Sequence, residues 1–496
     1  MTELCLLGLD SGSTATKAVV FDLTGRVRGT GRRRTATLTP QPGRVERDMA
    51  ACWEDTKAAI RAALADAGIG GERIGAVGVT AHGDGLYLLG RDHRPLGHGI
   101  TSLDDRASGL VRAWDEAGVL DRALPLIGQR PYPYAAVSLL AWLRQHEPAR
   151  YAAIGAILFC KDWLRLCLTG ERATDLTEAS TGFTDLHTQA YSEAALDLFG
   201  LNGLEAALPP MLEPSACAGR VTSAAAAATG LAAGTPVAAG LHDVTASAIG
   251  LGNLAPGALT MTAGTFSMNE VLWHAPRCDA RWACRAGTTR GSWMSMAISP
   301  ASSANLEWLT AILGADLDTL APELPAAFAA PSGVVFHPFL FGSPYEAPAS
   351  GGFFGLRGWH GRAHLARAVL EGIVFNHRVH VDALAEGYPL GPIRLTGGGT
   401  HTPLLGQLFA DGLGRTLEVR DVREAAALGA ALCGGVAAGL FADLPAAMRA
   451  CCHPGTTYRP EPARTAALDA AFARYQSLIA ALRPLWPGLH PDGAAA

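Results

Sequence analysis

Two stretches of the chain share one layout: an apolar run, a tight turn of glycine and hydroxyl residues, and a second apolar run. The first is LCLLGLDSGSTATKAVVFDLTGRV at residues 4–27, and the second is GALTMTAGTFSMNEVLW at residues 257–273. Apolar runs bounded by Gly, Ser and Thr are typical of strands joined in a hairpin. A unit that occurs twice indicates two related domains, with a break near residues 245–255. Chance is the alternative, because Gly-Thr turns between strands are common.

Elsewhere, segments of strand length alternate with segments at helical spacing. Residues 49–68 predict a helix that ends at Gly68, and residues 74–83 predict a buried strand that runs into a loop. Residues 234–252 predict a strand, a loop and a helix. This alternation predicts an α/β fold with mostly parallel sheets covered by helices. The Ala/Gly run at residues 424–441 predicts a helix whose small residues allow close backbone packing.

Composition argues against several classes of protein. Of the 496 residues, 49% are hydrophobic and 17% are charged, which is typical of a soluble globular protein. A net charge of −5 without a basic cluster argues against nucleic acid as a partner. No apolar stretch approaches the ~20 residues of a membrane helix, and no signal pattern opens the chain. The ten scattered cysteines contain no C-x-x-C pair, which predicts buried free thiols and a cytoplasmic location.

Three turns of glycine and hydroxyl residues predict a phosphate site: Asp10–Lys17, Gly264–Ser267 and Gly397–Thr402. None has the spacing of a P-loop or of a dinucleotide fingerprint. Turns without bulky side chains let backbone N–H groups approach phosphate oxygens, and two facing hairpins can clamp a triphosphate. Asp10, at the base of the first hairpin, is then the candidate ligand of Mg²⁺, through water, because Mg²⁺ needs few protein carboxylates.

The same segments carry a resemblance to a known family. GLDSGSTATKAVVFD, MTAGTFS and LTGGGTHTPLLGQLFAD, in that order, resemble the ATP site of the sugar kinase, Hsp70 and actin superfamily. GGFFGLRGWHGRAHLARAVLEG, residues 351–372, is similar to the second signature of the FGGY carbohydrate kinases. The matching positions are Gly351, Phe353, Gly355, Leu356, His364, Leu365 and Glu371.

Departures from the family pattern indicate which branch of the family the chain resembles most. PQPGRVERD resembles an early family segment, but Arg44 stands where a Trp is usual. PYAAVSLLAWLRQHEP keeps Trp142 and has Ser138 where a Lys is typical. With SLDDRA and SPASSANLEWLT, these features look most like the L-xylulose kinase and xylulokinase branch.

The resemblance implies two actin-like (ribonuclease H-like) α/β domains around a central cleft. Residues 1–248 would hold the sugar site, the first phosphate hairpin and the catalytic aspartate. Residues 249–496 would hold the second phosphate hairpin and the adenosine site. Many family members dimerise, so a homodimer is compatible with the resemblance.

The resemblance also implies the site residues. Asp243 is the catalytic base, and Asp10 is the Mg²⁺-linked acid. The sugar would be contacted by Ala81, His82, Asp104 and Asp243. ATP would be bound by Ser13, Thr14, Lys17, Gly264, Thr265, Ser303, Glu307, Gly398, Gly399 and Thr402, although Ser303 replaces a frequent Gly.

The implied activity is ATP-dependent phosphorylation of a small sugar hydroxyl, with a ketopentose such as L-xylulose, or a related 3-keto acid sugar, as the favoured substrate. D-Xylulose, L-ribulose, erythritol and glycerol stay open, as does a non-catalytic ATP-binding protein of the actin/Hsp70 class. A carboxylate that accepts the hydroxyl proton is what other kinases use, and Asp243 ends a strand where it can reach a cleft. Asp243 can also cap the helix that follows it, and the two roles are compatible. Roles for Asp84, Asp105 and His242 stay open.

Overall fold

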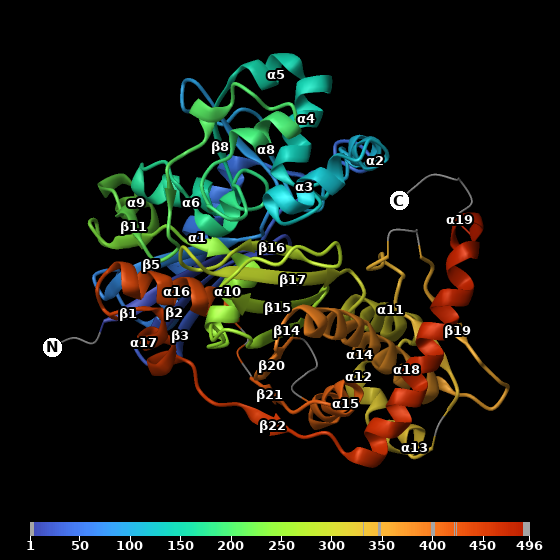
Figure 1. The fold of residues 1–496 in the computed structure, drawn as a ribbon. Helices are drawn as coiled ribbons and strands as arrows, with labels where there is room; N and C mark the ends of the chain where they lie inside the picture. Colours follow the sequence, from blue (N-terminus) through green and yellow to red (C-terminus); the bar gives the residue numbers. More distant parts are fainter. Residues whose placement is uncertain are drawn as a thin grey trace. The chain divides into compact units, whose positions relative to one another are not determined.

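The structure is a computed structural model that describes residues 4–330, 332–345, 349–397, 402–420, 422 and 424–489. The chain divides into two compact units, and each unit is assembled from separate segments (Figure 1). Unit 1 comprises Met1–Ala255, Leu272–Ser295 and Glu424–His453, and unit 2 comprises Pro256–Val271, Met296–Arg423 and Pro454–Ala496. The expected division after residue 248 lies close to the end of the first segment, but two later segments return to unit 1.

The first seven-stranded sheet lies in unit 1 and begins with the expected hairpin. Strands β1 (Cys5–Ser11) and β2 (Ala15–Asp22) pair in antiparallel fashion, and β3 (Val27–Arg34) extends the meander. The sheet order is β11-β12-β5-β1-β2-β3, with β5 (Ile74–Ala81), β11 (Cys217–Arg220) and β12 (Pro236–Ala238); β13 (Leu241–His242) pairs with β5. Helix α1 (Met49–Ala67) packs against β2 and β3 and ends at Gly68, as expected.

The prediction of mostly parallel sheets is wrong, because this sheet is mixed. β1 pairs in parallel with β5, and β5 pairs in parallel with β12 and β13, whereas the pairs β1–β2, β2–β3 and β11–β12 are antiparallel. The short turn between β1 and β2 explains the difference, since a tight turn can join only antiparallel neighbours.

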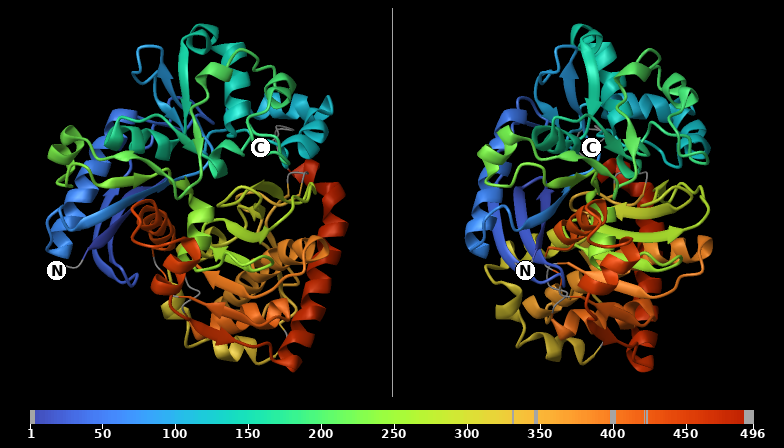
Figure 2. Two further views of the ribbon diagram at one scale, coloured as in Figure 1. Left: turned by 60° about the vertical axis from the view of Figure 1, so that its left-hand side comes forward. Right: turned by 90° about the vertical axis from the view of Figure 1, so that its left-hand side faces the viewer.

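The second seven-stranded sheet contains the second expected hairpin, formed by β14 (Leu259–Ala263) and β15 (Ser267–Trp273). Its order is β16-β17-β15-β14-β20-β21-β22, with β16 (Ala283–Ala286), β17 (Trp293–Ser299), β20 (Ile393–Thr396), β21 (Leu417–Val419) and β22 (Thr456–Tyr458). The helices of unit 2 include α11 (Ser303–Leu313), α14 (Arg362–Gly387), α15 (Pro403–Leu413) and α18 (Pro462–Leu482) (Figure 2). Among the helices of the described residues, none combines the length and apolar character that crossing a membrane requires.

Helix α16 (Ala425–Ala437) packs backbone to backbone on β1 and β5, as its small residues predict. A Cβ atom on Gly8 of β1 would lie 1.9 Å from the carbonyl oxygen of Ala427, and one on Gly78 of β5 would lie 1.7 Å from that of Ala430. Atoms cannot approach so closely, so these strand positions admit only glycine without a shift of the helix.

Helix α16 also packs closely on a neighbouring helix, and replacing Gly429 with Ala tests that contact, because helix propensity and packing predict opposite signs for the change in stability. Alanine is favoured over glycine in a helix by ~1 kcal/mol, but its Cβ would lie 1.9 Å from the carbonyl oxygen of Ala246 in α10 (Asp243–Gly250). Overpacking costs about 1–3 kcal/mol and more against backbone. We expect Gly429→Ala to lower the Tm by at least about 2 °C.

Gly109→Ala is the matched control, since Gly109 is an exposed residue of helix α2 (Ser108–Glu116), where only the flexible end of Arg112 approaches. Thermal unfolding followed by circular dichroism should show an unchanged or higher Tm for this variant. An equal gain in Tm for both variants would show that α16 does not pack closely on α10.

Candidate active site

Asp10 lies at the end of β1, directly across the hairpin from Lys17. Burial raises the pKa of the Asp10 carboxyl to about 7; the carboxylates of Asp243 and Glu424 add to the rise, and Lys17 opposes it. Lys17 Nζ pairs with Glu424 Oε2 at 2.9 Å, so its charge is shared with another acid. Asp10 therefore stands in a half-buried, electronegative environment to which a cation would be attracted.

The donor set around Asp10 fits Mg²⁺ better than an ion that needs a complete protein cage. Within the described ranges, no group of three or more His, Cys, Asp or Glu side chains is arranged to hold a metal. Mg²⁺ is commonly bound by one or two carboxylates, waters and substrate phosphates. Asp10 can supply the carboxylate of such a site, and water molecules and substrate phosphates would supply the other ligands.

Ser13 and Thr14 form the turn of this hairpin, and a buried arginine supports it. The guanidinium of Arg47, 2% exposed, donates from Nη2 to the carbonyl oxygens of Gly12 at 2.7 Å and Ser13 at 3.3 Å. A trans peptide directs its N–H opposite to its C=O. The N–H groups of Ser13 and Thr14 therefore point away from Arg47, as a phosphate-binding turn requires.

Asp243 is the first residue of α10, after the N-cap residue His242. Its Oδ1 accepts a hydrogen bond from the N–H of Val244 at 2.8 Å, and its side chain is 33% exposed. The N-cap position belongs to His242 and not to Asp243, although the Asp243 carboxylate accepts an N–H of the first turn. The side chain stands at the start of the helix, accessible to a ligand.

A buried polar cluster lies behind Asp243. His242 Nδ1 is 3.2 Å from Asp243 Oδ1, and His242 Nε2 is 3.0 Å from Arg285 Nη1. Arg285 also donates to Gln129 Oε1 at 2.9 Å and to Asp84 Oδ2 at 3.1 Å. Against its burial, Arg285 and His242 hold the pKa of Asp84 below its ordinary value.

The backbone at Asp84 is unusual, with a φ of 55° that non-glycine residues rarely adopt. Near this cluster, burial raises the pKa of the Glu178 carboxyl to about 8, although the charge of His242 opposes the rise. The sequence did not decide whether Asp84 and His242 belong to the site. It gave no signal for Arg285, which lies in the short strand β16.

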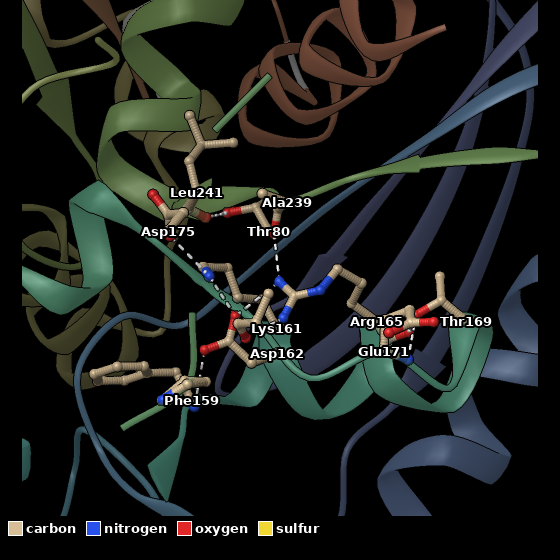
Figure 3. A network of polar contacts seen from close by, with 12 residues as sticks. Thr80, Phe159, Lys161, Asp162, Arg165, Thr169, Glu171, Asp175, Ala239 and Leu241 are labelled. Atoms are coloured by element: carbon tan, nitrogen blue, oxygen red, sulfur yellow. Dashed lines mark hydrogen bonds and ion pairs between the residues drawn. The ribbon is translucent and has the colours of Figure 1, made fainter. Parts of the chain in front are cut away.

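A second buried network holds the segment that leads to Asp243 (Figure 3). Lys161 Nζ lies 2.6 Å from Asp162 Oδ1 and 2.7 Å from Asp175 Oδ1, with all three side chains fully buried. Arg165 Nη1 donates to the same oxygen of Asp162 at 2.9 Å and to the carbonyl oxygen of Ala239 at 2.7 Å. Charges buried in this way are stable only when paired, so the network fixes helix α6 (Cys160–Thr169) against this segment.

Two threonines extend this support to β13. Thr177 Oγ1 donates to Asp175 Oδ2 at 2.6 Å and accepts the N–H of His242 at 2.9 Å. Thr80 Oγ1 donates to the carbonyl oxygen of Leu241 at 2.7 Å. The backbone just before Asp243 is thus bound on both sides.

Two of the predicted sugar contacts, Ala81 and His82, lie at the end of β5 and directly after it. Ala81, at the end of β5, is paired with His242 of β13 and with Ser11 of β1. His82 is 2% exposed, and its Nε2 lies 3.1 Å from the hydroxyl of Tyr87.

Asp104 has both carboxylate oxygens engaged. Oδ1 and Oδ2 accept from Arg106 at 2.7 and 2.8 Å, and Oδ2 also accepts the N–H of Val45 at 2.7 Å. Its side chain is buried. A sugar contact by Asp104 stays a prediction, and it would have to share these oxygens with Arg106.

The predicted nucleotide residues outside the first hairpin belong to unit 2. The carbonyl oxygen of Gly264 accepts the N–H of Ser303 at 2.9 Å, which joins the second hairpin to the start of α11. Glu307 follows one turn later on α11 and is exposed, as is Thr265. Thr402 is the N-cap residue of α15. Gly398 and Gly399 lie outside the described residues.

The raised pKa of Asp10 gives a testable dependence of stability on pH. Its carboxyl ordinarily titrates near 3.8 and here near 7, so in that window the native state keeps a proton that the unfolded state has released. Stability is then lost as the pH rises through the window. We expect Asp10→Asn to raise the Tm of the ligand-free protein, by more at pH 7.5 than at pH 5.

Asp22→Asn is the control of opposite sign, because hydrogen bonds from Thr24 and Arg26 hold the pKa of Asp22 below its ordinary value despite its partial burial. Its loss should lower the Tm at pH 7.5. Calorimetric scans at both pH values measure these shifts, and a lower Tm for Asp10→Asn at pH 7.5 would contradict the burial argument.

Comparison with known proteins shows the family to which the chain belongs. Residues 5–250 match the N-terminal domain, and residues 259–438 the C-terminal domain, of the FGGY family of carbohydrate kinases. The chain is 36% identical to the L-xylulose/3-keto-L-gulonate kinase of Escherichia coli, over 96% of this chain and 97% of that protein. It is 35% identical to a probable L-xylulose kinase of Pasteurella multocida, over 97% of this chain and 99% of that one.

Solved structures give the same result for the fold. The xylulose kinase from Rhodospirillum rubrum is similar with a TM-score of 0.88 at 28% identity, over 97% of this chain and 99% of that chain. This chain therefore belongs to the FGGY family of carbohydrate kinases, ATP-dependent phosphotransferases with an alcohol group as acceptor, and has the family's two actin-like α/β domains.

Proposed function

We propose that the protein transfers the γ-phosphoryl group of ATP to a hydroxyl of a small ketopentose such as L-xylulose, with Asp243 as the general base and Asp10 as the Mg²⁺-linked acid. One observation supports this most directly. The carboxyl ends of β1, β5 and β13 meet at one edge of the sheet, where Ala81 pairs with Ser11 on one side and His242 on the other. Asp10 and Asp243 stand next to these paired residues, and the charge of Asp243 raises the pKa of Asp10.

The two carboxylates suit different parts of the reaction. A sugar hydroxyl is a weak nucleophile at neutral pH, so a carboxylate that accepts its proton during phosphoryl transfer assists the reaction. Asp243 suits this role because its side chain is partly exposed. Asp10 and the outward N–H groups of Ser13 and Thr14 suit the phosphate end, where preorganised donors stabilise developing charge. Mg²⁺, when bound, would neutralise charge on the phosphates.

The remaining parts of the proposal concern the nucleotide and the substrate. Gly264, Thr265, Ser303 and Glu307 would contact ATP, with Gly398, Gly399 and Thr402 at the adenosine. L-Xylulose is favoured because two relatives of 35–36% identity carry that substrate in their names. D-Xylulose, L-ribulose, erythritol and glycerol are the alternatives. A cytoplasmic location and a homodimer also stay predictions.

The base is tested with Asp243→Asn, which keeps the shape of the side chain but cannot take up the proton. General-base catalysis contributes about 10²–10⁴-fold, so kcat should fall by about that range while the affinity for sugar changes little. ADP release in a coupled assay over a panel of the five candidate substrates measures kcat, and titration calorimetry measures sugar binding.

Asp197→Asn, an exposed position on helix α8 (Glu193–Leu198), serves as the control and should retain full activity. If the Asp243 variant kept more than about a tenth of the kcat, the loss would be smaller than a general base is expected to cause. Asp243 would then not be the base. L-Xylulose should give the highest kcat/KM of the panel. A higher value for another member would overturn the substrate assignment alone.

A further inference from the structure

The two carboxylate oxygens of Asp243 have different surroundings. Oδ1 accepts the N–H of Val244 at 2.8 Å and lies 3.2 Å from His242 Nδ1. Oδ2 accepts no hydrogen bond from the residues that the structure describes. One oxygen is therefore anchored to the protein, and the other is available to a ligand.

Arg285 determines which nitrogen of a neutral His242 carries the proton. A guanidinium has only donors, and its Nη1 lies 3.0 Å from His242 Nε2. Nε2 must then supply a lone pair, which leaves the ring proton on Nδ1, facing Asp243. Arg285 is itself held by Gln129 Oε1 at 2.9 Å and Asp84 Oδ2 at 3.1 Å, and it is 4% exposed.

A charged His242 leads to the same arrangement at Nδ1. Although burial opposes protonation, the carboxylates of Glu178, Asp243 and Asp84 raise the pKa of the imidazole to about 10. The imidazolium also carries a proton on Nδ1. Its Nε2–H cannot bond to Arg285, which has only donors, and would have Asp84 Oδ2, 3.7 Å away, as its partner. In either form Nδ1 carries a proton. It lies 3.2 Å from Asp243 Oδ1 without the alignment of a hydrogen bond, so with the charged ring this contact is an ion pair.

We propose that His242 is a positioning residue for the catalytic aspartate: its ring pairs through Nδ1 with Oδ1 of Asp243 so that Oδ2 receives the proton of the acceptor hydroxyl, and Arg285 acts through His242. The inference rests on the proposed function. As the acceptor oxygen bonds to the γ-phosphorus and the bond to ADP breaks, the hydroxyl proton passes to Oδ2. Oδ1 meanwhile keeps its contacts with Val244 and His242.

Two amide substitutions separate this role from simple packing. The amide nitrogen of Asn can occupy the place of Nδ1, whereas that of Gln reaches toward the place of Nε2. A hydrogen bond to a charged group is worth roughly 10- to 100-fold, so His242→Gln should lower kcat by about that factor. The KM for sugar should change by less than about threefold, because the interaction matters in the transition state. His242→Asn should recover most of the lost kcat.

A double-mutant cycle tests the part assigned to Arg285. Arg285→Met should lower kcat in the wild-type background and have little further effect in the His242→Gln background, because coupled residues are not additive. His146→Gln is the control, since this ring stacks on Trp142 at 4.4 Å in another part of unit 1. All variants are compared at a concentration and temperature where circular dichroism shows them folded.

The outcomes distinguish this inference from the proposed function. Equal losses of kcat for His242→Asn and His242→Gln, or wild-type kcat for both, would overturn the positioning role. A low kcat for Asp243→Asn in the same experiment would still support Asp243 as the base. Additive effects of Arg285→Met and His242→Gln would overturn the action of Arg285 through His242. Retention of kcat by Asp243→Asn would instead remove the base, and the inference with it.

Discussion

Direct backbone contact between α16 and the first sheet is the constraint on which the candidate site depends. Glycines replace side chains on both surfaces: Gly8 and Gly78 on the strands, and Gly434 on the helix. Because no side chains intervene, the helix and strands have little freedom to shift relative to each other. The contact also brings residues far apart in the chain together, so that Glu424 pairs with Lys17 beside Asp10.

The buried charges of unit 1 have a related role. Lys161, Asp162 and Arg165 are removed from water, and each is paired or bonded to backbone. Such pairs often contribute little net stability, but breaking one leaves a charge unsatisfied. The position of the segment before Asp243 is therefore strongly specified. Arg47 fixes the first hairpin in a similar way, since its guanidinium donates hydrogen bonds to the carbonyl oxygens of Gly12 and Ser13.

Local features of this fold were predictable from the sequence, and long-range partners were not. The two hairpins, the end of α1 at Gly68 and the helix α16 follow from residue patterns within short windows. The mixed sheet was not foreseen because strand alternation alone does not show which strands are neighbours. Asp10 stood out by its position at the end of a strand that reads as buried, and Asp243 by its resemblance to the catalytic aspartate of the family. Arg47 and Arg285 did not stand out, because their roles depend on hydrogen-bond partners tens to hundreds of residues away in the chain.

The central claim is that Asp243 serves the acceptor hydroxyl and Asp10 the phosphate end. A crystal structure with L-xylulose and a Mg²⁺ complex of a non-hydrolysable ATP analogue measures this directly. The account predicts a sugar hydroxyl within hydrogen-bonding distance of Asp243 Oδ2 and facing the γ-phosphorus, with Asp10 on the metal or its waters. A reacting hydroxyl held by another acid such as Asp104, with Asp243 turned away from the sugar, would contradict it.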